Sequence, residues 1–241
     1  MSKKIVLTFI TALFLSVYSL AIEESNPFKD TFITIGGGYS NPITQIGHFI
    51  ATGADENGND IGSYKYQDVK SSSVFAMSIG KNFGSIKTEL EYIDLGKNNY
   101  TQGGYANEDN YGYTYSLSSK AYMFNLGYSF NNLSQRFQPY ITAAIGLSEH
   151  KASSSELYHD GIYCGYDDGH TTKNLAKGVT LGARVNLNEH FAFDFSYKYL
   201  DLGKVKGSTK FYTGSTTDYI NNDLDGEVVT NIFMAKAVVK F

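Results

Sequence analysis

The chain has 241 residues and a formal net charge of −4 at pH 7, with 24 glycines, 20 tyrosines, three prolines and no tryptophan. This length suits a single all-β barrel domain, and the abundance of glycine and tyrosine favours strands and loops over helices. The acidic balance argues against nucleic acid as a partner, and the single Cys164 excludes an internal disulfide.

The N-terminus predicts a secretory signal peptide. Two lysines precede an apolar stretch at residues 5–17, and small residues at Ser19 and Ala21 stand three and one before a cleavage point. A membrane anchor is the alternative, but the apolar stretch is short for a bilayer and acidic residues follow it at once. We predict cleavage after Ala21, with residues 1–21 as signal peptide and residues 22–241 as one outer-membrane β-barrel domain.

Eight segments beyond the leader have about the length that a tilted membrane strand requires. They are residues 31–40, 73–83, 86–95, 120–130, 138–149, 175–187, 191–202 and 228–241. The connections alternate in length: those at 84–85, 131–137 and 188–190 are short, and those at 41–72, 96–119, 150–174 and 203–227 are long. Short periplasmic turns and long extracellular loops are typical of an outer-membrane barrel, and an even strand number puts both termini at the short turns.

The segment at residues 191–199 shows the alternation most clearly, because aromatic residues occupy every second position. Alternate residues of a strand share one face, so the aromatic side chains point one way and Asp194, Ser196 and Lys198 the other. No amphipathic helix or apolar strand is available to cover the aromatic face, so we expect it to meet lipid. Lipid offers no hydrogen-bond partners to the backbone, and only a closed barrel pairs every strand.

We therefore predict an all-β fold, an eight-stranded antiparallel up-and-down transmembrane β-barrel with short periplasmic turns and long extracellular loops. The same alternation runs through residues 73–83, 121–130 and 178–187, with small and polar residues inward. A soluble, lipocalin-like barrel would show the inverse pattern. The segments at 31–40 and 138–149 alternate less regularly.

A short motif occurs twice, as Tyr-Ile-Asp-Leu-Gly-Lys from Tyr92 and Tyr-Leu-Asp-Leu-Gly-Lys from Tyr199. Both copies stand where a strand leaves for a long loop. A tyrosine there would anchor its ring among lipid headgroups, so we predict Tyr92 and Tyr199 as interface anchors. The alternative is that the two copies arose independently from the ordinary chemistry of strand ends.

The eight alternating strands, the paired exits and the last strand, which ends at Phe241, resemble the small outer-membrane β-barrel family. This family includes the OmpA/OmpX-type barrels and the opacity-type surface proteins of Gram-negative bacteria. The resemblance implies an outer-membrane location and an assembly signal, read by the barrel-assembly machinery, at Phe241, Val239, Ala237 and Phe233. It covers the whole mature chain. The sequence predicts no peptidoglycan-binding domain after the barrel.

We predict no catalytic residue, metal site or cofactor. All five histidines are expected outside the strand cores, and Ser148-Glu149-His150 is the one cluster with the composition of a hydrolase site. Ser148 and His150 would share a face and Glu149 would point away. The third long loop carries His159, Asp160, Cys164, Asp167, Asp168 and His170, but their spacing matches neither a closed zinc site nor an EF-hand. A solvated acidic loop and an incidental cysteine are the expectation.

The long loops combine tyrosine with flexible polar residues, as recognition loops do. The tyrosines are Tyr64, Tyr66, Tyr100, Tyr105, Tyr111, Tyr113, Tyr115, Tyr158, Tyr163, Tyr166, Tyr212 and Tyr219. As an alternative, Tyr111, Tyr113 and Tyr115 extend a strand pair above the membrane. We expect a monomeric surface protein whose loops mediate adhesion, host-factor binding or immune interaction, as the opacity-type resemblance implies, with outer-membrane lipids around the barrel.

The competing function is a small porin or transporter of small or hydrophobic solutes, and the inward charges bear on it. Glu89, Glu91 and Asp194 face Arg184 and Lys236 at similar depth, with Lys198 above them. An eight-stranded barrel is only just wide enough for side chains, so these charges must pair. We predict a charge network across the lumen that plugs the barrel.

Overall fold

The computed structural model describes residues 28–54, 60–106, 109–131, 133–134, 136–153, 156–159, 162–208, 210–213, 216–219 and 224–241. The predicted signal peptide lies outside the described residues. Within the described ranges, no helix has the length and apolar character needed to cross a membrane.

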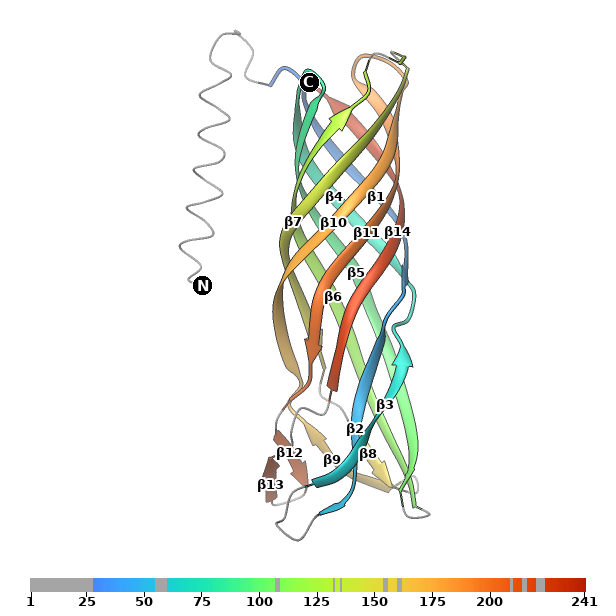
Figure 1. Cartoon of the computed structure of the whole chain (residues 1–241), viewed down its shortest axis with the longest axis vertical. Coiled ribbons are helices and arrows are strands. Elements are labelled where there is room, and N and C mark those ends of the chain that lie inside the picture. The colour runs from blue at the N-terminus through green and yellow to red at the C-terminus, as the bar shows by residue number, and fades with distance from the viewer. Residues whose placement is uncertain are drawn as a thin grey trace, which may run out of the picture.

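Eight antiparallel strands close into a barrel, as the sequence predicts (Figure 1). They are β1 (Thr31–Pro42), β4 (Ser72–Phe83), β5 (Ile86–Ala106), β6 (Asp109–Ser129), β7 (Phe137–Ala152), β10 (His170–Asn186), β11 (Phe191–Lys206) and β14 (Leu224–Lys240). Each pairs with the next along the chain, and β14 pairs with β1 to complete the ring. The two ends meet at the short turns, where the Asp30 amide donates to the Phe241 carbonyl over 3.0 Å.

The long connections are not plain loops, which corrects the expectation from sequence. β5 and β6 stay paired far beyond the predicted boundary, out to Ala106 and Asp109. Six further strands form hairpins at the same end: β2 (Gln45–Ala54), β3 (Asp60–Asp68), β8 (Glu156–His159), β9 (Ile162–Asp167), β12 (Lys210–Thr213) and β13 (Thr216–Tyr219). β8 pairs with β6, and β2 with β14, so the hairpins continue the barrel sheet outward. The extended strand pair considered for the tyrosines around Tyr113 is therefore present.

The repeated motif forms the same local structure in both copies. Gly96 and Gly203 have φ angles of 72° and 77°, in the left-handed region that favours glycine. The preceding aspartates, Asp94 and Asp201, each accept the amide hydrogen of their glycine, over 2.9 and 3.0 Å. Strand register shifts at both places, so each copy is a β-bulge.

The predicted alternation of side chains is confirmed in the membrane part of the barrel. On β11 the aromatic residues face outward, with Phe193 and Phe195 46% and 51% exposed, whereas Asp194 is fully buried. The inward set is not polar throughout, however, and this corrects the sequence analysis. The interior has two layers, one charged and one apolar, stacked along the barrel axis.

We call the layer nearer the short turns the charge layer: Lys87, Glu89, Glu91, Arg184, Asp194, Lys198 and Lys236. The layer nearer the loops is the apolar layer: Ile93, Leu95, Leu117, Met123, Leu200, Leu202 and Ile232. On β5 and on β11 the change from charged to apolar occurs just before the bulge.

Candidate functional site

The charge layer is built by four strands that lie on different sides of the barrel. Lys87, Glu89 and Glu91 alternate along β5, and their even spacing turns all three inward. Arg184 comes from β10, Asp194 and Lys198 from β11, and Lys236 from β14. Each of the seven side chains is at least nine-tenths buried. Their contacts therefore form in an interior that water barely enters.

Glu91 is the centre of the part of the layer that lies toward the loops. Its carboxylate accepts hydrogen bonds from Lys198, from Lys236 Nζ over 3.1 Å and from Asn125 Nδ2 over 3.1 Å. The donors belong to β11, β14 and β6, so one side chain of β5 connects strands across the lumen. Charge-assisted hydrogen bonds of this kind are stronger than neutral ones.

Glu89 and Asp194 hold the part of the layer nearer the turns. Glu89 lies 3.0 Å from Lys87 Nζ and 3.6 Å from Lys236 Nζ, and it also accepts from the Ser78 hydroxyl. Asp194 lies 3.6 Å from an Arg184 nitrogen and 3.9 Å from Lys87 Nζ. The Tyr140 hydroxyl donates to its other oxygen over 2.7 Å.

The six charged residues singled out in the sequence thus lie together, but Lys87 connects them and was missed. Without Lys87, the pair of Arg184 and Asp194 would be separate from the group around Glu91. Its position two residues before Glu89 on the same face was the signal that could have found it.

Two aromatic rings complete the charge layer, and sequence reasoning missed them as well. Lys87 Nζ lies 3.9 Å from the centre of the Tyr140 ring and 5.4 Å from that of Phe32, and the Arg184 guanidinium lies 4.2 Å from Phe32. The seven charged groups comprise four cations and three carboxylates, so the layer carries one more cation than anion. The ring faces offer negative potential to this excess, as cation–π contacts do.

His150 occupies the wall of the apolar layer, not a loop. It belongs to β7 and is fully buried, so the expectation that all five histidines lie outside the strand cores is wrong for His150. His48 lies on β2, and His159 and His170 lie at the ends of β8 and β10. Its Nε2 donates to the carbonyl of Leu202 over 3.0 Å, and its Nδ1 lies 2.8 Å from the Ser119 hydroxyl. Burial lowers the pKa of the imidazole below 6.5, and the bond to Leu202 opposes that shift. At neutral pH the ring is uncharged and fixes the β11 bulge to β7.

The cluster Ser148-Glu149-His150 divides as alternation predicts. Ser148 and His150 point inward and are buried, while Glu149 points outward and pairs with Lys173 over 3.0 Å. The histidine has a serine beside it in Ser119, and both side chains are buried in the barrel wall.

In the third loop, Asp160 lies outside the described residues, and Cys164 lies on β9 at the point where the register with β8 shifts. No group of three side chains suited to a metal ion occurs in the part of the chain that the structure describes.

The outward face changes from apolar to charged near the two bulges. The ion pairs Lys120–Asp94, Lys173–Glu149 and Lys177–Asp201 lie on the loop side of this change. Of the predicted anchors, Tyr92 donates its hydroxyl hydrogen to Asp94 on β5, and Tyr199 is exposed on the outer face of β11. Of the predicted assembly residues, Phe233, Ala237 and Val239 face outward on β14, and Phe241, which follows the strand, is exposed.

A closed barrel with an aromatic, lipid-facing wall and both ends of the described chain at the short turns is the architecture of a bacterial outer-membrane protein. The family model described as "Outer membrane protein beta-barrel domain" matches residues 8–241. The chain belongs to this family. It is an outer-membrane β-barrel protein of a Gram-negative bacterium, surrounded by membrane lipid.

Comparison with known outer-membrane barrels adds one relative by sequence and several by fold. Outer membrane protein PagN of Salmonella typhimurium is 34% identical over 113 residues, which are 47% of this chain and 46% of PagN. The matched part thus spans about half the length of this curated relative.

Among solved structures, OprG from Pseudomonas aeruginosa is 16% identical, with 88% of this chain and 96% of OprG covered and a TM-score of 0.57. Neisserial surface protein A is 13% identical, with 88% and 98% covered and a TM-score of 0.45. The likeness to OprG shows the fold.

Proposed function

We propose that this outer-membrane barrel is a surface-binding protein whose extracellular strands and loops mediate adhesion to a host surface or binding of a host factor. The observation that carries the proposal is the contrast between a filled interior and an extended exterior. The charge layer and the apolar layer occupy the lumen, whereas β5 and β6 continue about ten residues beyond the bulge as a paired hairpin.

The extracellular hairpins form a surface of paired strands that can hold side chains in fixed positions. Tyr100 and Tyr115 are stacked, with ring centres 5.1 Å apart and planes at 10°, and the Tyr100 hydroxyl accepts the amide hydrogen of Lys70. The Tyr115 hydroxyl accepts from the Gln67 side chain of β3 over 3.1 Å. These contacts join the β2–β3 hairpin to the β5–β6 hairpin. A preorganised surface loses less conformational entropy on binding than mobile loops do.

The proposal includes a monomeric barrel, delivery by the barrel-assembly machinery and no enzymatic activity. His150 is the described histidine with a serine partner, and its burial supports a structural role. The alternative function is a small porin or transporter. Reproducible unitary currents from the purified protein in planar bilayers would support that alternative.

Register-matched loop shortening tests surface binding directly. His48 pairs with Lys65, Thr101 with Thr114, and Lys210 with Tyr219, so an Asn-Gly turn can replace the residues between each pair without shifting the strands. Cells that display each shortened barrel are compared with wild type for binding to cultured epithelial cells.

We expect at least one shortened barrel to lose tenfold or more of the binding while folding normally. The proposal would be contradicted if wild-type cells bound no better than cells without the protein, or if all three variants bound as well as wild type. Protease treatment of intact cells provides the control for topology, because it should release loop peptides and leave the strands protected.

A further inference from the structure

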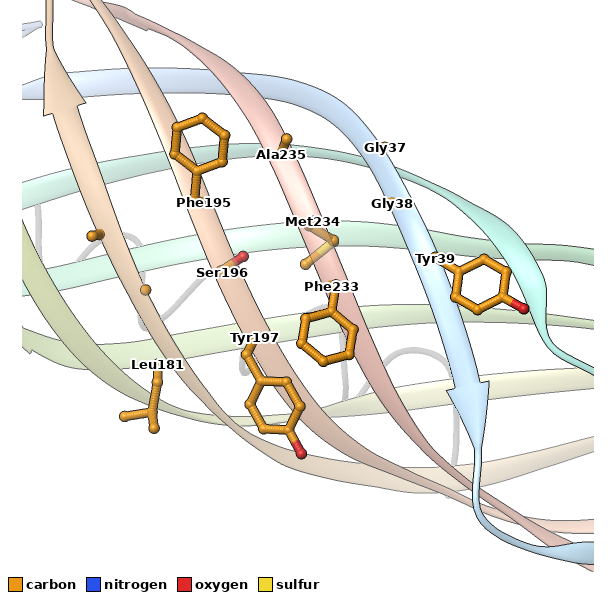
Figure 2. A pocket seen from close by; sticks show the side chains of 12 residues that line it. Gly37, Gly38, Tyr39, Leu181, Phe195, Ser196, Tyr197, Phe233, Met234 and Ala235 are labelled. Carbon is orange, nitrogen blue, oxygen red and sulfur yellow. The ribbon is translucent and has the colours of Figure 1, made fainter.

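The lipid-facing wall contains a depression that crosses β1, β14, β11 and β10. One row of paired outward residues runs across these strands: Gly37, Ala235, Phe195 and Ala183. Three of the four have no side chain beyond Cβ, so the outer surface of the barrel is recessed there. The resulting depression has a volume of about 750 Å³. Figure 2 shows large rings around the short side chain of Ala235.

Large side chains border the depression on the side toward the loops. The next paired row consists of Tyr39, Phe233, Tyr197 and Leu181, all outward and between 37% and 56% exposed. The rings of Tyr197 and Phe233 are 5.1 Å apart, which fixes them as one wall (Figure 2). The depression is therefore apolar and is bounded by aromatic side chains.

The outward surface becomes polar directly above this border. The Tyr197 hydroxyl donates to the Asn231 side chain over 2.7 Å, and one row further lie Lys177 and Asp201, 3.3 Å apart. The hydroxyl of Tyr39 has no hydrogen-bond partner among the described residues. Tyrosine hydroxyls lie at the headgroup level of a membrane, so the depression lies in the hydrocarbon just beneath the outer headgroups.

We propose that this depression binds one acyl chain of an outer-leaflet lipid, whose ester or amide carbonyl accepts a hydrogen bond from Tyr39. A flexible chain fits a concave apolar surface between aromatic walls, and its contacts there exceed those on a convex barrel wall. The carbonyl that links the acyl chain to its headgroup lies at the depth of the Tyr39 hydroxyl, because both mark the boundary between the hydrocarbon and the polar headgroups.

A second copy of this chain is the other occupant to consider. Two-fold dimers place the same surface patch of both copies in contact. The depression would then face itself, and the space would stay empty. A single acyl chain, by contrast, can enter the depression and contact its floor and walls.

The test fills the depression and measures lipid retention. Ala235→Leu puts a larger apolar side chain into the recessed row, while Ala143→Leu makes the same change at an outward position of β7 outside the depression. The full-length folded proteins are incubated with dimyristoyl phosphatidylglycerol in detergent, and the retained lipid is counted by native mass spectrometry. We expect wild type and Ala143→Leu to keep one lipid, and Ala235→Leu to bind it at least tenfold more weakly.

Two further comparisons separate chain recognition from other causes. Tyr39→Phe should weaken retention several-fold, and a phosphatidylcholine with the same chains should bind as well as the phosphatidylglycerol. Equal retention by Ala235→Leu and wild type, or an equal loss in Ala143→Leu, would overturn the proposal. A dimer in sedimentation that Ala235→Leu abolishes would assign the depression to a second copy instead.

Discussion

The charge layer and the apolar layer fill the same lumen by different physical means. In the charge layer, each contact has a direction and a partner: Glu91 pairs with Lys198 and Lys236, and it is the one carboxylate paired with Lys198 among the described residues. In the apolar layer, side chains such as Leu200 and Ile232 are both hydrocarbon and differ in shape alone.

This difference shows that the charge layer specifies the strand register of the barrel, whereas the apolar layer contributes to its folding free energy. A shift of one residue along β5 would turn Glu89 and Glu91 toward lipid, which specifies the strand pairing sharply. Buried ion pairs add little net stability, because desolvation offsets their attraction. The apolar layer contributes free energy through buried area instead.

The largest effect should come from breaking the charge layer at its centre. Glu91→Ala leaves Lys198 buried without a carboxylate, which should lower the free energy of unfolding by about 3–5 kcal/mol. Urea unfolding of the detergent-folded protein measures this change. Glu149→Ala is the matched control, because it removes an exposed partner of Lys173 and should cost less than about 1 kcal/mol. Equal costs for the two variants would show that the lumen is hydrated.

Truncation of a side chain in the apolar layer should lower the free energy of unfolding by nearly as much. Leu202→Ala removes a fully buried side chain and should lower the free energy of unfolding by about 2–5 kcal/mol. Leu181→Ala shortens a leucine that faces lipid and is 54% exposed, so it serves as control in the same titration. If the two substitutions lower the free energy of unfolding equally, the interior near Leu202 is not tightly packed.

Substitution of the bulge glycine by alanine should destabilise the barrel more in one copy of the motif than in the other. Gly96→Ala and Gly203→Ala both force a side chain into the left-handed region, at about 1–2 kcal/mol each. A Cβ at Gly203 would also lie 2.7 Å from Asn174, whereas the nearest atom at Gly96 is 3.4 Å away. Thermal unfolding should therefore rank Gly203→Ala as the more damaging variant, and the reverse order would contradict these contacts.

The smallest effect should be a pH dependence that originates at His150. Burial depresses the pKa of the folded imidazole below 6.5, so the unfolded state binds the proton first as pH falls. Stability should be fully present above pH 6.5 and decrease below it. The His150→Gln variant keeps a hydrogen-bond donor for the Leu202 carbonyl, but glutamine does not titrate in this pH range. Unfolding free energies across this range should fall more steeply for wild type, and parallel curves would exclude His150 as the source.

The alternation of aromatic and small residues was enough to predict the eight barrel strands, because lipid on one side and a narrow lumen on the other act on every second residue. The outer hairpins were predicted only as an alternative, for the strand pair around Tyr113, because the long connections are rich in glycine and polar residues and show little apolar periodicity. Pairing with a neighbouring strand, which the sequence does not display, stabilises them instead.

The charged residues of the site were also visible in the sequence, but their partners were not. Lys87 stands close to a short turn, where an inward lysine can equally reach water. Phe32 and Tyr140 come from the two strands with the least regular alternation. The apolar layer was not predicted either, because it lies where the strands continue beyond the membrane. An apolar interior is as stable there as in a soluble protein.

The long pairing of β5 with β6, which runs from Ile86 to Ala106 with one bulge after Asp94, has a mechanical consequence. A force applied at the tip near Ala106 and directed away from the cell acts nearly along these strands. It loads the hydrogen bonds to neighbouring strands in shear, all together, rather than opening them one at a time. The tip is thus tethered to the membrane through the whole barrel wall, and tension on the hairpin is shared by strands on both sides.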